Sequence, residues 1–255
     1  MSLALASRKA ALLAPRIRDP DALAYIAAVE AADGQALEPA IKRAIDTFVL
    51  GCRADGTWNA IKASCILAGA RTLSGALVPL AGTAPTNFNF VSGDYDRKTG
   101  LVGDGSTKYL NSNRDNNADP QDNHHLSVYV TTTPSIGNSY IGCSVNPPSN
   151  IGTTFTRSRS DIAVSAVNVS GFIGISRSLS SSYIARRNQV DAIPAVISST
   201  PLTGINAVFA RGGASGATIH SNARIAFYSI GESLDLALLD ARVTDLINAF
   251  GAAIP

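Results

Sequence analysis

The sequence predicts a mainly β protein, an antiparallel sandwich preceded by an α-helical N-terminal region and followed by a short C-terminal helix. Three observations predict this fold. Apolar residues recur at helical spacing up to about residue 80, short β-type stretches separated by Gly, Pro, Asn and Ser follow, and a helical stripe returns at the end. No long helical run separates the β-type stretches, which favours antiparallel pairing over strands joined by crossover helices.

The first helix is expected within DPDALAYIAAVEAADG, residues 19–34, at the start of a region that should be mostly helical up to Leu80. Asp19 is a suitable N-cap, and Pro20 fits the first helical position, where its missing N–H is tolerated. Apolar residues follow at three-to-four spacing until Gly34 ends the pattern.

Two further helices are expected before residue 80. LEPAIKRAIDTFVLG, residues 37–51, has a proline near its start, one apolar face and Gly51 as its stop. ADGTWNAIKASCILAGA, residues 54–70, is the third candidate. Trp58 and Cys65 are expected to pack between helices there, because residues of these types are usually buried.

Beyond Leu80 the composition changes to that of strands and turns. AGTAPTNFNF, residues 81–90, is expected to be a connection because it is rich in small residues, Pro and Asn. The expected strands are TKYLNS (107–112), HLSVYVTTT (125–133), SYIGCSV (139–145), TTFTRS (153–158), DIAVSAVNVSG (161–171), SSYIARR (181–187), INAVFA (205–210) and ARIAFYSIG (223–231). Their spacing is typical of an antiparallel sandwich.

The last helix is expected in GESLDLALLDARVTDLINAFG, residues 231–251. Its apolar stripe consists of Leu234, Leu238, Leu239, Val243, Leu246, Ile247 and Phe250. We expect this helix to pack on the edge of the sandwich.

Composition argues against several classes of protein. Lys and Arg outnumber Asp and Glu by only 21 to 19, so the chain lacks the basic excess typical of nucleic-acid binding. Arg8 and Lys9 interrupt the apolar start, which leaves no signal core or membrane span there. Three widely spaced cysteines indicate neither a disulfide framework nor a zinc site. We expect no nucleic acid, no membrane insertion and synthesis in a reducing compartment.

Two segments resemble a known domain family. GDGSTKYLNS, residues 103–112, is followed by a polar loop and HLSVYVTT, and this order resembles the opening of concanavalin A-like (laminin G-like) jelly-roll domains. RIAFYSIGESLDLALLDARVTDLI, residues 224–247, resembles the last strand of such domains and the leucine-rich helix after it. Together with the helical leader, the module resembles structural proteins of tailed bacteriophages.

The resemblance implies a concanavalin A-like jelly roll that serves as a recognition or assembly module. Residues 1–82 would be a helical docking region, and residues 83–255 the jelly-roll domain. The protein would belong to a virion, after synthesis in the host cytoplasm, with other virion proteins as partners. Some relatives bind Ca²⁺ or carbohydrate at loops on the rim of the sandwich, and some bind neither, so the fold alone does not settle function.

The polar stretch from residue 100 to residue 130 contains the candidate binding residues. These are Asp104, Asn113, Asp119, Asp122, Asn123 and His124. Asp115, Asp119 and Asp122 also offer the oxygen ligands that Ca²⁺ prefers, although their spacing lacks the register of an EF-hand loop. The simpler interpretation is a polar turn in which Asn and Asp bond their own backbone.

The histidines do not form a metal-binding pattern. Strand alternation would send His124 and His125 to opposite faces, and His220 lies far away in the sequence. A zinc site needs three or four ligands at productive spacing, so we expect no metal and no cofactor.

Catalytic signatures are missing as well. Glutamate occurs only at Glu30, Glu38 and Glu232, so no strand carries the paired carboxylates of a glycosidase. No G-x-S-x-G motif or phosphate-binding glycine loop occurs. We expect a solvated face for the arginines of the β half, which are Arg157, Arg159, Arg177, Arg186 and Arg187. The sequence therefore indicates no catalytic residues and no enzyme.

Three hypotheses remain. The first is a non-enzymatic bacteriophage virion structural protein, docked through its helical region and displaying the jelly roll for particle assembly, decoration or host attachment. The alternative is a carbohydrate-binding receptor-recognition module of a tail fibre, with a host-surface glycan as ligand. The third is a glycan hydrolase. A homo-oligomer is expected because short helices must bury their apolar faces. The candidates for contact with a partner subunit are Ile41, Ile45, Phe48, Trp58 and Ile61.

Overall fold

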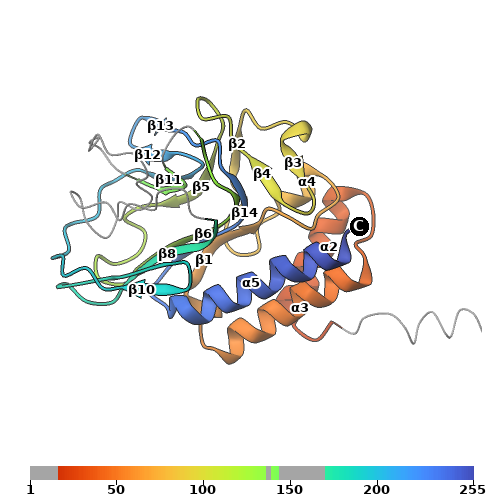
Figure 1. Ribbon diagram of the computed structural model, residues 1–255, viewed down its shortest axis with the longest axis horizontal. Helices are drawn as coiled ribbons and strands as arrows, with labels where there is room; N and C mark the ends of the chain where they lie inside the picture. The colour runs from red at the N-terminus through yellow and green to blue at the C-terminus, as the bar shows by residue number, and fades with distance from the viewer. Residues whose placement is uncertain (1–16, 136–138, 144–169) are drawn as a thin grey trace, which may run out of the picture.

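The chain folds into antiparallel β-sheets with helices packed against the larger sheet (Figure 1). This computed structural model describes residues 17–135, 139–143 and 170–255. Within them, every ladder between named strands is antiparallel, and four α-helices occur, the last of them C-terminal. The prediction of a mainly β, antiparallel fold with helices before and after the sheets is confirmed.

The first two helices form where the sequence predicts them. Helix α2 spans Pro20–Asp33, and the Asp19 carboxylate caps its first N–H groups. Helix α3 spans Pro39–Ala54 and continues through Gly51, the residue predicted to stop it. A Cβ on Gly51 would lie 2.7 Å from the Arg242 side chain, so this glycine makes room for a neighbouring helix.

The prediction of a third helix is wrong. Trp58–Ala60 form one 3-10 turn, η1, and Ile61–Ile66 form strand β1, which pairs with the last strand of the larger sheet. Cys65 lies in that strand, and the hydroxyl of Tyr228 donates to its sulfur at 3.4 Å. A short apolar run of this kind cannot be assigned to helix or strand by periodicity alone.

The larger sheet has the strand order β10-β9-β8-β6-β14-β4-β3. Its strands are β1 (Ile61–Ile66), β3 (Tyr95–Asp96), β4 (Gly100–Val102), β6 (His124–Thr132), β8 (Gly171–Arg177), β9 (Ile184–Arg187), β10 (Val190–Ala192) and β14 (Arg224–Gly231). Strand β6 lies along one side of β14, while β4 and β1 share its other side.

The smaller sheet has the order β2-β5-β11-β7. Its strands are β2 (Thr86–Phe88), β5 (Tyr109–Asp115), β7 (Ile141–Gly142) and β11 (Ile205–Val208). The remaining short elements are helix α4 (Leu73–Ala76), the 3-10 turn η2 (Ser92–Asp94) and the hairpin of β12 (Arg211–Gly213) with β13 (Gly216–Thr218).

Most of the expected strands contain an observed strand. These are the stretches at 107–112, 125–133, 139–145, 181–187, 205–210 and 223–231. The expected strand at 153–158, and all but the last two residues of the one at 161–171, lie outside the described residues. Strand β8 was missed, and β2 lies in the stretch predicted to be a connection. In β8, Gly174 packs closely, since a Cβ there would lie 2.9 Å from Leu236.

Two apolar clusters lie on opposite faces of the larger sheet. The helix-side cluster joins α2, α3 and the C-terminal helix to sheet residues such as Phe172 and Phe227. The inter-sheet cluster joins residues such as Val128 and Ile173 to Leu110 and others of the smaller sheet. Alternation along the strands separates the two sets, because neighbouring side chains point to opposite faces.

A β-bulge in β14 interrupts this alternation. The pairing of β14 with β6 shifts between Ile225 and Phe227. As a result Ala226 and Phe227 both join the helix-side cluster, where the Phe227 ring meets Phe48 of α3 edge-on at 5.8 Å. The bulge therefore adds one apolar side chain to the helix-covered face.

Helix α5, Leu236–Ala253, lies on the face of the larger sheet, and the prediction that it packs on the edge is wrong. Figure 1 shows α5 and α3 side by side beneath the strands. Most of the predicted stripe is buried, but Leu238 is exposed. The Arg242 guanidinium pairs with the Asp55 carboxylate at 2.7 Å, which joins α5 to the end of α3.

The predicted boundary at residue 82 runs through the helix-side cluster, whose members come from both sides of it. Ile41, Ile45, Phe48 and Ile61 are buried in this cluster, and Trp58 is half-buried against it. The expectation that these four aliphatic and aromatic side chains contact a partner subunit is therefore wrong. Their apolar surface is covered by the chain itself.

Candidate functional site

Asp104 forms the turn between β4 and β5. Its carboxylate accepts hydrogen bonds from the N–H groups of Ser106, Thr107 and Lys108 and from the Thr107 hydroxyl, at 2.7–3.0 Å. Partial burial favours the neutral acid, but these donors outweigh it and lower the pKa of Asp104. The carboxylate thus holds the Gly-Asp-Gly turn in place.

Asn113 lies within β5, in a left-handed backbone conformation with a φ of 54°. Its amide group donates to the carbonyl of Ala84 at 2.7 Å and to the hydroxyl of Thr86 at 3.0 Å. Asparagine tolerates this conformation better than most residues. These hydrogen bonds join the start of β2 and the residue Ala84 before it to β5.

The loop between β5 and β6 holds three of the other predicted residues. The Asp119 carboxylate is buried and accepts a hydrogen bond from Arg114 Nε at 3.0 Å. Asn123 Oδ1 accepts from the N–H and hydroxyl of Ser233 at 2.8 and 2.6 Å. Asp122 Oδ1 is buried and has no hydrogen-bond partner among the described residues. Polar side chains of this loop therefore bind it to β5 and to the segment after β14.

The adjacent histidines are both fully buried at the start of β6, with different partners. His124 Nδ1 lies 3.1 Å from the Gln121 carbonyl. His125 Nδ1 donates to the Glu232 carbonyl at 2.6 Å, so its Nε2 accepts from the Ser229 hydroxyl at 2.7 Å. Burial lowers the pKa of His125 to about 4, which keeps the ring neutral near pH 7.

The predicted site residues do not form one site. Asp104 precedes β5 and Asp119 to His124 follow it, and this strand of seven residues is about 23 Å long. Across residues 17–135, 139–143 and 170–255, no group of three or more His, Cys, Asp or Glu side chains could hold a metal ion. The described contacts give all of these residues except Asp122 structural roles.

Arg177, expected on a solvated face, is one of the largest fully buried side chains. Its guanidinium donates to the carbonyls of Leu179, Ser180 and Ser182 and to that of Val196, at 2.9–3.3 Å. The loops on either side of β9 and β10 are therefore tied together by one cation. Arg157 and Arg159 lie outside the described residues.

Three aromatic side chains form a patch that the sequence pattern did not predict. Phe88 of β2 and Tyr109 of β5 are cross-strand partners whose rings stack with centroids 4.3 Å apart and planes 5° apart. His220 approaches Tyr109 edge-on at 5.8 Å. Phe88 is 37% exposed, and Asp104 lies close enough to His220 to influence its charge. We call Phe88, Tyr109 and His220 the aromatic patch.

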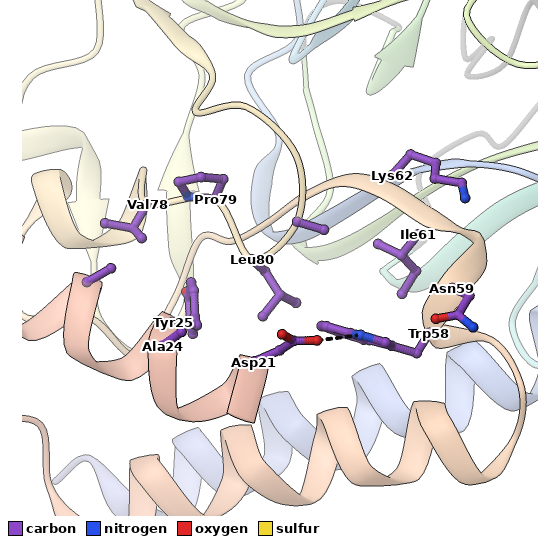
Figure 2. A pocket seen from close by; sticks show the side chains of 12 residues that line it. Asp21, Ala24, Tyr25, Trp58, Asn59, Ile61, Lys62, Val78, Pro79 and Leu80 are labelled. Carbon is purple, nitrogen blue, oxygen red and sulfur yellow. Dashed lines mark hydrogen bonds between the residues drawn. The ribbon is translucent and has the colours of Figure 1, made fainter. Parts of the chain in front are cut away.

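A second unpredicted feature is a pocket of about 610 Å³ between α2 and β1, lined by both polar and apolar side chains (Figure 2). Its lining residues are Asp21, Ala24, Tyr25, Ala28, Trp58, Asn59, Ile61, Lys62, Val78, Pro79, Leu80 and Ala81. The indole N–H of Trp58 donates to the Asp21 carboxylate at 3.1 Å, as the dashed line in Figure 2 shows. The pocket is within the size range of small-ligand sites.

The outer surface of α2 beside this pocket is unusually apolar. Leu23 is 55% exposed, and its neighbours Ala24, Ala27 and Ala28 are exposed as well. Helices on a protein surface normally present polar residues to water. The combination of pocket and apolar helix face suits contact with another molecule.

Comparisons with known proteins place the chain in no family. No protein-family model matches it. No curated protein shows significant similarity to it. None of the helices in the described part of the chain combines the length and the apolar character that crossing a membrane requires.

Proposed function

We propose that the chain is a non-enzymatic structural protein of a tailed-bacteriophage virion, with a concanavalin A-like jelly roll displayed for assembly, decoration or attachment. Two features support the jelly-roll assignment. The Gly103-Asp104-Gly105 turn leads into β5 and then the long core strand β6, and the last strand, β14, runs through Gly231 into α5. This is the order of elements on which the resemblance rests.

The pocket between α2 and β1 is the observation that carries the docking role. It lies entirely within the N-terminal region, and the exposed apolar face of α2 continues from it. A side chain from a neighbouring virion protein would fill the pocket, and α2 would cover the contact. Burial of apolar surface stabilises such contacts by about 25 cal/mol per Å².

Incorporation into particles tests this proposal. The tagged chain should co-purify with virions through a density gradient and be detected there by mass spectrometry. Ala28→Arg would place a charge in the pocket and should reduce incorporation at least tenfold. Ala241→Arg, which changes an exposed alanine of the C-terminal helix α5 away from the pocket, is the matched control and should incorporate normally. A chain absent from purified particles would contradict the proposal.

The aromatic patch favours a second candidate function, glycan recognition at a host surface. Sugar rings have an apolar C–H face that stacks on aromatic rings, and hydroxyls that need polar partners. The exposed Phe88 ring offers the first, and the imidazole of His220, which lies against Tyr109, offers the second. Weak sites of this kind gain avidity when many copies are displayed on one particle.

A glycan array followed by titration calorimetry tests the second candidate. Phe88→Ala and His220→Ala should each abolish binding of the saccharide that the array identifies. Val91→Ala changes another exposed apolar residue nearby in sequence and should bind like the parent chain. No saccharide signal on the array, or unchanged binding by both variants, would reject this function.

A further inference from the structure

The pocket between α2 and β1 contains a hydroxyl group without a partner. Tyr25 lines the pocket and is only 6% exposed, and its hydroxyl forms no hydrogen bond with any residue that the structure describes. Buried tyrosine hydroxyls usually have a hydrogen-bond partner. Burial also raises the pKa of Tyr25 well above its ordinary value, so the hydroxyl keeps its proton and can both donate and accept. A hydrogen-bonding group of a bound molecule would supply the missing partner.

The ring of Trp58 offers an aromatic surface in the same pocket. The Arg53 guanidinium lies over one face of this ring, 5.4 Å from its centre, and the indole N–H is bonded to Asp21. Figure 2 shows the ring edge-on, below Leu80 and Ile61, which line the pocket as well. Aromatic rings pack favourably on one another, so a flat ring is a suitable occupant of this space.

Charged side chains of both signs line the pocket, and each belongs to an ion pair. Asp21 pairs with Arg53, which also pairs with Asp19. Lys62 Nζ lies 3.3 Å from Glu232 Oε1. An anion that enters the pocket would meet Asp21, and a cation would meet Lys62. Because a charge loses far more solvation than a hydroxyl group when it leaves water, the pocket favours an uncharged group.

We propose that the pocket takes an uncharged ring that carries a hydroxyl group, namely a tyrosine side chain of the partner protein that docks here. The ring would lie against Trp58, and its hydroxyl would hydrogen-bond with Tyr25. At about 610 Å³ the pocket is in the size range of sites that enclose small organic ligands, so a single side chain fits within it. The inference rests on the docking role proposed above and names the side chain that the role requires.

Fluorescence of Trp58 measures occupancy of the pocket, because this residue is the only tryptophan of the chain. p-Cresol, which is the tyrosine side chain as a free molecule, should change the emission in a saturable manner. Toluene has the same ring without the hydroxyl and should bind about two- to tenfold more weakly, since one hydrogen bond is lost. p-Toluate and 4-methylbenzylammonium, which add a negative and a positive charge to that ring, should also bind more weakly. Equal affinity for toluene and p-cresol, or tighter binding of either ion, would overturn the proposal.

Two variants connect the fluorescence signal to this pocket. Tyr25→Phe removes only the hydroxyl, which has no partner in the described part of the chain, so the variant should fold and should bind p-cresol no better than toluene. Ala28→Leu places a larger side chain in the pocket and should lose the saturable response. Ala241→Leu, the same change at an exposed position of α5, should bind like the parent. A preference for p-cresol that survives in Tyr25→Phe, or an unchanged response in Ala28→Leu, would contradict the proposed contacts.

N-acetyltyrosinamide distinguishes a protein side chain from a free phenol. It holds the tyrosine side chain between two uncharged amide groups, as a peptide does, and the exposed Asn59 that also lines the pocket is available to them. It should therefore bind at least as tightly as p-cresol. Binding of p-cresol without binding of N-acetyltyrosinamide would mean that the pocket takes a free small molecule and no partner protein. The titrations use the purified chain alone, so a chain that binds these probes but is absent from virions would refute the virion role and keep the pocket's specificity.

Discussion

The two faces of the larger sheet are buried by different means. The helix-side face is covered by α2, α3 and α5, and charged pairs such as Arg242 with Asp55 surround the cluster. The inter-sheet face is covered by a second sheet. Buried polar side chains on this side bind backbone carbonyls, as Ser112 does with Asn206 at 2.7 Å, Asn116 with Leu202 at 2.9 Å and the Arg177 guanidinium with Val196 at 3.1 Å.

This difference follows from the backbone hydrogen-bonding groups that each covering layer leaves without partners. A helix satisfies its own interior backbone groups, so the side chains around it are free to form ion pairs at the rim. Strands joined by irregular loops leave backbone carbonyls without ladder partners, and buried polar side chains such as these donate hydrogen bonds to them. The helices also come from both ends of the chain, whereas the inter-sheet face is built largely from its middle.

Deletion of residues 1–82 is expected to have the largest effect. It removes β1 from β14 and strips α2 and α3 from the helix-side cluster, which exposes Phe172 and Phe227 to water. The remaining chain should lose its cooperative thermal transition and near-ultraviolet circular dichroism. A fragment that melts cooperatively with native spectra would mean that the inter-sheet cluster supports the fold alone.

Truncation of one helix-side ring is the next test. Phe227→Ala should lower the free energy of unfolding by about 3–5 kcal/mol, since it opens a cavity beneath α3. Phe88→Ala, the same change at an exposed position of the smaller sheet, should lower it by less than about 1 kcal/mol. Urea denaturation measures both. Equal losses would contradict the assignment of Phe227 to the core.

Acid should weaken the fold through His125. Its pKa is about 4 in the folded chain, below the ordinary value of 6.5, so the unfolded chain binds the proton first as the pH falls. Stability should be constant above pH 6.5 and decline by about 3 kcal/mol between pH 6.5 and pH 4. His125→Gln should flatten this decline, and His220→Gln should retain it. An unchanged slope in His125→Gln would show that other groups cause it.

The smallest effect is expected on the smaller sheet. Asn113→Ala loses the bonds to Ala84 and Thr86 and places a less tolerant residue at positive φ, so it should cost about 1–2 kcal/mol. Asn113→Gly loses the same bonds but suits the backbone, so it should cost less. Thermal denaturation separates the two. If the glycine variant is the less stable, backbone conformation is not the reason for Asn113.

Sequence patterns predicted elements well where a cap or a long amphipathic stripe was present. Asp19 with Pro20 located α2, and the leucine-rich stripe located α5. Strands β1 and β8 were missed because both are buried on two faces, so neither shows alternation of apolar and polar residues. Gly51 was misinterpreted because its role is to accommodate Arg242, a residue distant in the sequence.

The candidate site could be predicted less well. Several of the polar residues chosen from the sequence have structural partners that local patterns do not reveal, such as Ser233 for Asn123 and Ala84 for Asn113. The aromatic patch depends on the pairing of Phe88 with Tyr109, and His220 comes from a third segment. Only the Asx turn at Asp104 followed directly from its neighbours in the sequence.

The pairing of β1 with β14 has a consequence for synthesis. Cys65 and Tyr228, which meet across these strands, are 163 residues apart in the sequence. At a ribosomal rate of about 5–20 residues per second, β14 is synthesised roughly 8–30 s after its partner strand β1. Throughout that interval the apolar faces of α2, α3 and β1 are not yet buried by β14 and α5. The nascent chain should therefore depend on a holding chaperone, and slowing translation before residue 224 should increase its aggregation.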